Sequence, residues 1–429
     1  MTYDIAAIGI GPMNLALAAL ADEVPELSIA AYDAKPVYDW HPGLMFDWAK
    51  LQVSFLADLV SLVRPTSRWS FLSYLAERDR MYPFYIAERF HIPRREYTEY
   101  CAWVADSLPS CHFGTEVAAL DWDHNHRVWV LTLRTATGTR QTTARNVVLG
   151  VGTSPVVPEP LRPLLGARVY HSGEHLHRID ALAGDGVRHI VVVGSGQSGA
   201  EVFLDLIRQQ REYRWALTWL TRTPSFAPLD YSKLVLEYTT PEYMRYFHSL
   251  DPDVRDRLIA SQWQLYKGIS TETIDEIHNE LYEHMLDGNR PPVRLLPGTA
   301  VHNAAKEGDE IRLSCLHRDT GRTVTITADA VVAATGYAAV RPALLKPVEH
   351  LIAWDSQGRF DVMVNHQVRL VDGVTGGLYV QNAELHTHGA AAPDLGIAAY
   401  RSATILNSIA GREVFRLPKR TAFQSFEAV

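Results

Sequence analysis

A strand–turn–helix pattern at the N-terminus restricts most strongly what this chain can fold into. An apolar run at residues 5–8 leads into Gly9-Ile-Gly11-Pro12-Met-Asn14, and a stretch rich in Leu and Ala follows. Glycine at the first position permits a tight turn, and glycine at the second lets the backbone approach a pyrophosphate, which the helix N-terminus attracts. The usual third glycine is replaced by Asn14, so the motif is incomplete, and a coincidental strand–turn–helix is the alternative to a dinucleotide site.

Asp33 supports the dinucleotide site. It follows a second apolar run, residues 27–32, about 20 residues beyond the glycine turn. A carboxylate at this position accepts a hydrogen bond from a ribose hydroxyl. Together the two features predict an α/β nucleotide-binding unit at the start of the chain.

The composition excludes several classes of protein. With 429 residues, 47% of them hydrophobic, the chain can form two or three domains with full cores. A net charge of −8 without a basic block argues against nucleic acid or an anionic membrane as a partner. Three distant cysteines suggest neither a disulfide framework nor a metal site. Without a signal-like N-terminus or an apolar run of about 18 residues, a cytoplasmic location is expected.

A second and complete fingerprint lies in the middle of the chain. The apolar run 189–193 precedes Gly194-Ser-Gly196-Gln197-Ser198-Gly199 and a helical pattern. Three glycines in this context predict a second dinucleotide site. Arg222 follows the next predicted strand, residues 216–220, where an NAD enzyme would carry an acid. Because arginine suits a 2′-phosphate, NADPH is favoured over NADH, and a solvated surface arginine is the alternative.

The order of the remaining elements predicts a discontinuous first domain. Residues 229–290 form a helical, aromatic and charged insert, after which strands resume and a break at Thr335-Gly336-Tyr337 returns the chain to the first domain. A closing helix is expected at residues 394–409. The predicted fold is α/β, with two dinucleotide-binding (Rossmann-like) domains for FAD and NADPH and a small helical substrate-binding insert. The predicted ranges are 1–165 and 329–429 for the FAD domain, 166–228 and 291–328 for the NADPH domain, and 229–290 for the insert.

At these residues the sequence resembles the flavin-dependent N-hydroxylating monooxygenases of siderophore biosynthesis, the lysine and ornithine N-monooxygenase family. The Asn14 that weakened the general motif is the residue this family shows. The matching segments run nearly from end to end: Gly9–Asn14, Trp40-His-Pro-Gly43, Leu51-Gln-Val-Ser-Phe-Leu56, Arg95-Glu-Tyr97, Gly194–Gly199, Ala334-Thr-Gly-Tyr337 and Thr387-His-Gly389.

The resemblance implies a reaction and a set of cofactor-binding residues. NADPH would reduce FAD, O2 would add to form a C4a-hydroperoxyflavin, and a neutral primary amine would attack it to give an N-hydroxylamine and water. Trp40, His41 and Gln52 would lie near the flavin and Arg222 near NADPH. Without the family, a packed loop would be the commoner reading of Trp40 and His41. The resemblance also implies a homo-oligomer, a tetramer or a dimer.

Departures from the family pattern bear on the substrate. The resemblance assigns a lysine in Phe-Leu-Lys-Asp-Leu to the α-carboxylate of lysine or ornithine, and this chain has Ala57 there. Leu236 and Leu265, the latter followed by Tyr266, stand where ornithine enzymes carry asparagines. A buried carboxylate without partners costs several kcal/mol, on the order of a thousandfold in affinity. The predicted substrate is therefore a diamine, cadaverine first and putrescine second, with histamine-type amines more distant.

Asp394 and Gly396 form a further departure. Glycine at position 396 replaces a serine of the family, and Asp394 is a candidate acceptor for the distal ammonium of a diamine. The alternative is an N-cap aspartate that opens the last helix.

Other classes with two nucleotide sites fit less well. A disulfide reductase needs a CxxC-type pair, which this sequence lacks. The segment His171-Ser-Gly173-Glu-His-Leu-His177 matches the linker motif of Baeyer–Villiger monooxygenases only in part. A nucleotide sensor would have no use for the aromatic insert. L-lysine N6-monooxygenase is the nearest alternative activity.

Overall fold

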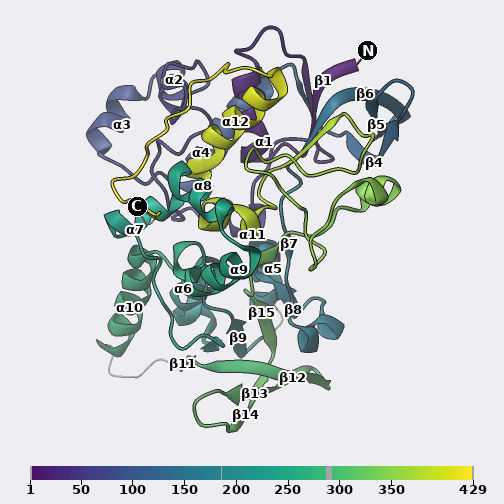
Figure 1. Ribbon diagram of the computed structural model, residues 1–429. Helices are drawn as coiled ribbons and strands as arrows, with labels where there is room; N and C mark the ends of the chain where they lie inside the picture. The colour runs from purple at the N-terminus through teal and green to yellow at the C-terminus, as the bar shows by residue number, and fades with distance from the viewer. Residues whose placement is uncertain (1, 185, 287–291, 428–429) are drawn as a thin grey trace.

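The computed structural model describes residues 2–184, 186–286 and 292–427 (Figure 1). A seven-stranded sheet has the order β3-β2-β1-β6-β5-β4, and β17 pairs with β6. Its central strands are parallel, whereas β4, β5 and β6 pair antiparallel. The strands are β1 (Thr2–Ile8), β2 (Ile29–Tyr32), β3 (Cys111–His112), β4 (Glu116–Asp123), β5 (Val128–Thr135), β6 (Gly138–Leu149) and β17 (Gly377–Val380).

Helix α1 (Pro12–Ala21) lies at the centre of the first core. All ten of its residues are buried. Its own Leu and Ala side chains make every face of the helix apolar, and it packs beside α12 (Ala398–Ala410) and α4 (Arg94–Ser107). Pro12 suits the first helical position, since the missing N–H has no partner there in any helix. The other helices of this region are α2 (Phe71–Glu77), α3 (Met81–Ala87) and α11 (Leu385–His388).

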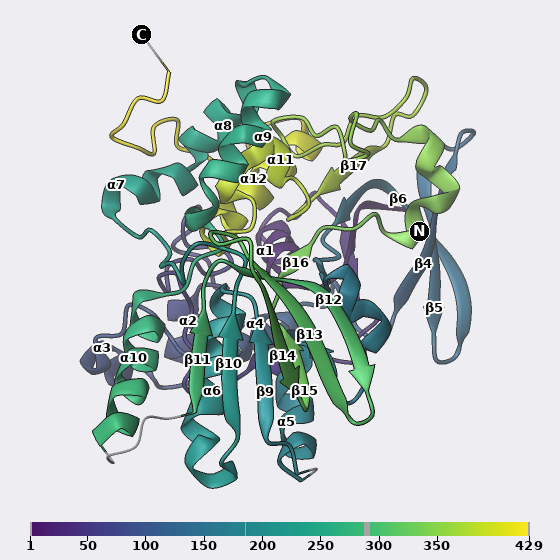
Figure 2. The same cartoon turned by 90° about the horizontal axis from the view of Figure 1, so that it is seen from below.

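A second, parallel sheet has the order β11-β10-β9-β15-β8. Its strands are β8 (Val169–His171), β9 (His189–Val193), β10 (Ala216–Leu220), β11 (Val293–Leu296) and β15 (Ala330–Ala333), and α5 (His175–Gly184) and α6 (Gln197–Tyr213) accompany them. A three-stranded antiparallel sheet, β12 (Thr299–Glu307), β13 (Glu310–His317) and β14 (Thr323–Ala328), lies beside it in Figure 2. The predicted α/β fold with two nucleotide-binding sheets is confirmed.

The course of the chain between the sheets differs in part from the prediction. The predicted boundary at residue 329 gave β15 to the first domain, but β15 pairs with β9 in the second sheet. The chain leaves the second sheet only after β15, where β16 (Tyr337–Ala338) pairs with β7 (Ser154–Pro155). The predicted domain ranges otherwise stay predictions.

The helical insert connects the two sheets. Its elements are α7 (Lys233–Leu236), α8 (Pro241–Ser249), α9 (Pro252–Ser261), the 3-10 helix η5 (Trp263–Leu265) and α10 (Thr271–Leu286). Helices α8 and α9 pack near α11, which belongs to the region of the first sheet. Helix α10 packs on α6, which accompanies the second sheet (Figure 2). Among the described residues, no helix is long and apolar enough to cross a membrane.

Candidate active site

The first glycine turn has the geometry of a pyrophosphate cradle. Gly9 has φ +90°, and a Cβ on it would lie 2.4 Å from the carbonyl oxygen of Gly150, so no other residue fits. A Cβ on Gly11 would meet no atom within 4 Å, so this face of the turn is open to a ligand. The turn follows the carboxyl end of β1, where open α/β sheets bind nucleotides.

The Asn14 side chain supports the turn from its buried side. Its Nδ2 donates to the carbonyl oxygens of Ile8 (3.1 Å) and Gly9 (2.9 Å), and its Oδ1 accepts a hydrogen bond from Gln381 (2.7 Å). The side chain is fully buried and fills the space beside Gly150. Asn14 also donates to the carbonyl oxygen of Val148 (3.4 Å), so its side chain braces β1 against β6. The predicted place of Asn14 in the cofactor site stays a prediction.

Asp33 lies beside the same turn. Its Oδ2 accepts a hydrogen bond from the backbone N–H of Ile10 (2.8 Å), and its Oδ1 accepts one from that of Lys35 (2.9 Å). Each carboxylate oxygen accepts more than one bond, so Asp33 retains capacity for a ribose hydroxyl. The residues present fit FAD at this cradle.

The second glycine turn repeats the first. Gly194 has φ +120°, and a Cβ on it would lie 2.1 Å from the carbonyl oxygen of Ala334; one on Gly199 would lie 2.4 Å from that of Gly194. The nearest atom to a Cβ on Gly196 is the carbonyl oxygen of Lys267 at 3.6 Å. Ser198 is half-buried on the first turn of α6, and Arg222 is exposed just beyond β10. These residues fit a pyridine dinucleotide.

The two cradles meet at a pair of glutamines. Gln52 donates a hydrogen bond to Oε1 of Gln197 (3.2 Å), which also accepts one from the backbone of Ser270 (2.8 Å). Gln52 was predicted for the flavin and Gln197 for the nicotinamide nucleotide. Their contact brings both predicted sites to one junction, where a hydride donor and the flavin must meet.

A buried ion pair, missed in the sequence, crosses the same junction. The Arg94 guanidinium binds both carboxylate oxygens of Glu201 (2.6 and 3.1 Å) and donates to the carbonyl oxygen of Leu44 (2.7 Å). Glu201 is 1% exposed. The sequence signal for this pair was Glu201 itself, which stands among apolar residues of the helix after the glycine turn. A glutamate in such a place is rarely buried without a charged partner.

Trp40, His41 and Tyr337 lie together at the junction. The Trp40 ring packs on Tyr97 at 5.4 Å between centroids, and the His41 ring lies 6.0 Å from Tyr337. Desolvation and, to a smaller extent, the charges of Arg94 and Lys35 lower the pKa of His41 to about 4, so its imidazole is neutral near pH 7. His41 nevertheless keeps accessible surface.

The segment that resembles a Baeyer–Villiger linker borders this junction. A Cβ on Gly43 would lie 2.0 Å from the carbonyl oxygen of Gly173, and the His171 ring lies 4.8 Å from Tyr337. The backbone between Thr335 and Tyr337 turns sharply, with φ +83° at Gly336.

Three predicted substrate residues converge on one point. A Cβ on Gly396 would lie 3.1 Å from Oδ1 of Asp394 and 4.0 Å from Cβ of Ala57. Oδ1 of Asp394 accepts a hydrogen bond from the backbone of Gly396 (2.6 Å), so Asp394 is an N-cap, but not that of the last helix, whose N-cap is Ile397. The cap opens a 3-10 turn, η8 (Leu395–Ile397), and for this reason α12 begins at Ala398 and not at the predicted residue 394.

The second oxygen of Asp394 remains available. Within the described part of the chain, Oδ2 has no hydrogen-bond partner. Desolvation raises the pKa of Asp394 from its ordinary value, against smaller effects of the Gly396 hydrogen bond and the Arg401 charge. Burial and then the Asp394 charge raise the pKa of Tyr231, which places the insert near this carboxylate.

The other predicted substrate residues lie on the insert. Leu236 ends α7, Leu265 ends η5, and both are half-buried. The Tyr266 hydroxyl donates to the carbonyl oxygen of Ile259 (3.1 Å). Their substrate contacts stay predictions.

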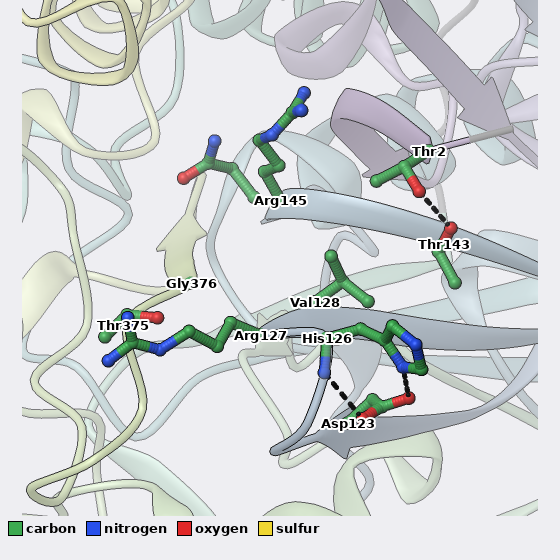
Figure 3. Close-up of a pocket in the computed structure, with 10 residues that line it drawn as sticks. Thr2, Asp123, His126, Arg127, Val128, Thr143, Arg145, Thr375 and Gly376 are labelled. Carbon is green, nitrogen blue, oxygen red and sulfur yellow. Dashed lines mark hydrogen bonds and ion pairs between the residues drawn. The ribbon is translucent and has the colours of Figure 1, made fainter.

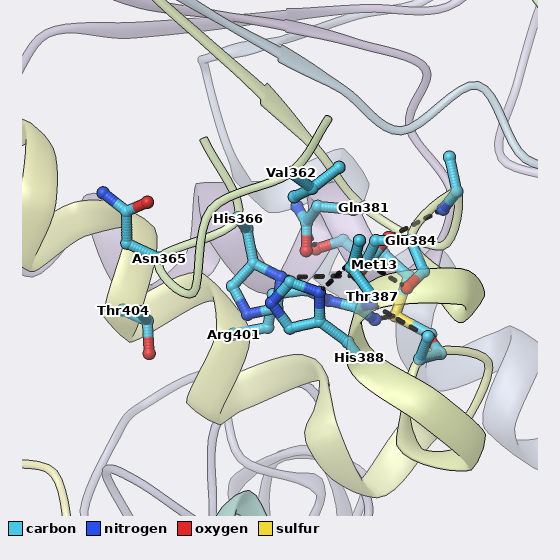
Figure 4. A network of polar contacts seen from close by, with 12 residues as sticks. Met13, Val362, Asn365, His366, Gln381, Glu384, Thr387, His388, Arg401 and Thr404 are labelled. Atoms are coloured by element: carbon cyan, nitrogen blue, oxygen red, sulfur yellow. Dashed lines mark hydrogen bonds and ion pairs between the residues drawn. The ribbon is translucent and has the colours of Figure 1, made fainter. Parts of the chain in front are cut away.

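A fully buried charged network around Arg401 and Glu384 lies next to Met13 of the first cradle (Figure 4). Arg401 forms an ion pair with Glu384, donates to the carbonyl oxygen of Ala392 (2.9 Å), and lies 2.8 Å from Sδ of Met13, next to Asn14. Desolvation alone would raise the pKa of Glu384, but the Arg401 charge and His366 hold it well below its ordinary value. An arginine on the apolar face of the predicted last helix was a sequence signal for this network.

A surface hollow of about 800 Å³ lies elsewhere (Figure 3). Thr2 and His126 line it, at the amino end of β1 and the turn after β4. Nucleotides bind at the carboxyl ends of parallel strands, so this hollow is not the predicted site.

Known proteins share this architecture and these sequence features. A family model described as L-lysine 6-monooxygenase/L-ornithine 5-monooxygenase matches residues 1–339. The putrescine N-hydroxylase of Acinetobacter baumannii is 38% identical over 426 residues, which cover 99% of this chain and 93% of that protein.

Two solved structures extend the comparison. The FAD-bound cadaverine monooxygenase DfoA of the Erwinia amylovora desferrioxamine pathway superposes with a TM-score of 0.96 at 38% identity, covering 100% of this chain and 99% of that one. The Kutzneria ornithine N-hydroxylase KtzI, with reduced FAD, NADP+ and L-ornithine, has a TM-score of 0.89 at 26% identity, with 96% and 99% coverage.

Proposed function

Because the chain belongs to the L-lysine 6-monooxygenase/L-ornithine 5-monooxygenase family, we propose that it N-hydroxylates one amino group of an aliphatic diamine for siderophore biosynthesis. Enzymes of this family are NADPH-dependent flavin N-monooxygenases, and FAD supplies the activation of O2. In the balanced reaction, one amine, one O2, one NADPH and one H+ give one N-hydroxylamine, one water and one NADP+. Cadaverine is the preferred substrate in this proposal, and putrescine is second.

The convergence of Ala57 and Asp394 carries the substrate proposal. Family members that act on amino acids are expected to hold an α-carboxylate with a lysine at position 57. This chain has a methyl group there, and the carboxylate of Asp394, whose Oδ1 accepts the Gly396 N–H, lies beside the same glycine. The local charge is thereby reversed from cationic to anionic, which favours a distal ammonium over a carboxylate.

Gly396 makes this arrangement possible. A side chain at position 396 would begin 3.1 Å from Oδ1 of Asp394, closer than ordinary van der Waals contact. The serine of other family members would therefore require the carboxylate to shift by a few tenths of an ångström. Ala57, Asp394 and Gly396 act as one set in this proposal.

The remaining residues would position the cofactors. Gly11 and Asp33 would hold FAD, and Gly196 and Arg222 would hold NADPH. A neutral His41 near the junction adds no positive charge beside the reacting amine, which must itself be neutral to act as a nucleophile.

The names of similar proteins support a diamine without ordering the two candidates, since one of them is a putrescine N-hydroxylase and another a cadaverine monooxygenase. One methylene is worth about 1–3 kcal/mol in a pocket, so a measurable preference is expected. The homo-oligomer and the cytoplasmic location stay predictions.

A substrate panel tests the proposal. The FAD-loaded protein is supplied with cadaverine, putrescine, L-lysine, L-ornithine or histamine, and NADPH oxidation and hydroxylamine formation are recorded together. Hydroxylamine from the diamines with little from the amino acids is expected, because only the latter bring an unpaired carboxylate. Equal kcat/KM for L-lysine and cadaverine would refute the diamine proposal, whereas NADPH oxidation without hydroxylamine from any amine would refute N-hydroxylation.

A further inference from the structure

Two cations without carboxylate partners flank the second glycine turn. Arg222 lies just beyond β10, and Lys267 lies just after η5 on the insert, with its carbonyl oxygen 3.6 Å from the Cβ position of Gly196. Among the described residues, neither forms an ion pair; the charged group of Lys267 lies 5.2 Å from the centroid of the Tyr266 ring. Unpaired cations beside a glycine turn are the arrangement expected of an anion site.

The backbone fixes Lys267 in this place. A Cβ on Gly268 would lie 2.3 Å from the backbone nitrogen of Leu229, so only glycine allows the two segments to approach this closely. Leu229 N–H donates to the carbonyl oxygen of Ile269 (2.8 Å), and Ile269 N–H donates to that of Ala227 (3.1 Å). Lys267 is therefore held beside the chain that leaves β10, although it belongs to the insert.

Three hydroxyl groups lie between the ends of β9 and β10. Ser195 Oγ lies 2.8 Å from Thr223 Oγ1 and 2.9 Å from Thr221 Oγ1, and the two threonine oxygens are 2.8 Å apart. Ser195 belongs to the glycine turn, and the threonines flank Arg222. In a Rossmann-like sheet the adenosine ribose lies at these strand ends.

We propose that Lys267 joins Arg222 in binding the 2′-phosphate of NADPH, with the Ser195, Thr221 and Thr223 hydroxyls at the same site. A dianionic phosphate between the two side chains would replace their mutual repulsion by attraction. Arginine supplies a planar fork and lysine a compact charge, so the pair can surround the phosphate oxygens. Burial and the Arg222 charge already lower the pKa of Lys267, in keeping with their proximity.

The insert would then contribute to coenzyme selectivity as well as to amine binding. This inference does not depend on which amine is hydroxylated. It assigns a function to Lys267 that neither the glycine motif nor Arg222 indicates.

Binding of NADP+ and NAD+ to the oxidised, FAD-loaded protein tests this inference by titration calorimetry. Lys267→Met keeps most of the apolar stem and removes the charge. This substitution should weaken the binding of NADP+ by about tenfold or more, as expected for the loss of one charged hydrogen bond. It should leave the affinity for NAD+ within about twofold of the parent value. Lys267→Arg should restore most of the NADP+ affinity.

Matched variants complete the design. Lys233→Met removes an exposed lysine of the same insert and should change neither affinity. Arg222→Met should also weaken the binding of NADP+ but not that of NAD+. The double variant should lose less NADP+ affinity than the product of the two single losses, because both side chains bind one group. Equal losses for NADP+ and NAD+ in Lys267→Met, or no loss for either, would overturn the assignment. A protein that hydroxylates no amine would still give these affinities, so the two proposals fail separately.

Discussion

Asp394 is a residue at which stability and substrate binding are expected to oppose each other. Its folded-state pKa is raised by desolvation, so folding favours the protonated form, and its contribution to stability is lost as pH rises through that raised pKa. Asn is an equally good N-cap and carries no charge. Asp394→Asn should therefore unfold at a higher temperature than the parent protein near pH 7, while diamine KM rises about tenfold or more.

The measurement compares thermal unfolding and amine kinetics across pH. In the parent protein, diamine KM should rise as pH falls through the raised pKa, because protonated Asp394 no longer attracts an ammonium. The Asn variant should lack this part of the pH dependence. If the variant kept the parent diamine KM and chain-length preference, Asp394 would be only a helix cap.

Ala57 is the complementary residue. Ala57→Lys would place an ammonium near Asp394, where it competes with the distal ammonium of a diamine. We expect a loss of diamine kcat/KM of about tenfold to a hundredfold and a gain of L-lysine hydroxylation, measured as hydroxylamine formed per NADPH oxidised. Ala57→Met, which is long and uncharged, is the control for volume. Equal losses of diamine activity in both variants would assign the effect to size.

At the scale of elements, the C-terminal segment after α12 acts as a strap over the insert. In Figure 1 it runs in yellow from α12 to the neighbourhood of α7. The Glu237 carboxylate accepts hydrogen bonds from the backbone of Phe423 and Gln424 (3.0 Å each), and that of Glu242 accepts them from Thr421 and Ala422 (2.7 and 3.1 Å). The strap thus fixes the segment that carries Leu236.

Two phenylalanines of the strap form a matched pair for testing it. The centroid of the Phe426 ring lies 4.9–6.0 Å from the ring centroids of Tyr238, Tyr243 and Tyr246. The Phe423 side chain, in contrast, is 89% exposed. Phe426→Ala should lower the free energy of unfolding by about 1–3 kcal/mol, from the lost ring contacts, and raise diamine KM. Phe423→Ala should change the stability by less than about 0.5 kcal/mol.

Denaturant unfolding and amine kinetics of both variants decide the prediction. NADPH-dependent flavin reduction should stay unchanged in each, because the hydrogen bonds and ring contacts that residues 421–427 make within the described chain are with the insert and not with the second glycine turn. Equal effects of the two substitutions would contradict a specific role of the Phe426 contacts.

Local patterns explain which elements were predictable. Strands at 189–193 and 216–220 match their predicted bounds, because each is a short apolar run next to turn residues. The strap was not predictable, since Glu237 meets backbone groups about 187 positions away. The role of Asn14 was equally hidden, because the Val148 carbonyl that it contacts (3.4 Å) comes near only when β1 and β6 pair.

At the scale of the whole molecule, the contact between the sheets determines how the two cradles face each other. The sequence predicted Gln52 and Gln197 for different cofactors, but their hydrogen bond depends on the packing of elements that are distant in the chain. The Arg94–Glu201 ion pair crosses the same boundary and involves two nearly buried side chains, 12% and 1% exposed. Its removal would affect the joint between the cradles, and also the hydrogen bond that Gln197 of the second glycine turn donates to Glu201 (3.0 Å).

Glu201→Gln should therefore cost about 3–5 kcal/mol of unfolding free energy, because Arg94 is left nearly buried without a counter-charge. Beyond this loss of stability, the joint would loosen, and we expect more NADPH oxidised per hydroxylamine formed even at a temperature where the variant is folded. Glu116→Gln is the matched control, since its pair with Arg134 is half-exposed, and it should cost less than about 1 kcal/mol. Chemical unfolding with parallel NADPH and hydroxylamine assays separates the two effects. A destabilised Glu201→Gln variant with parent-like coupling would mean that the ion pair stabilises the fold without setting how the cradles face each other.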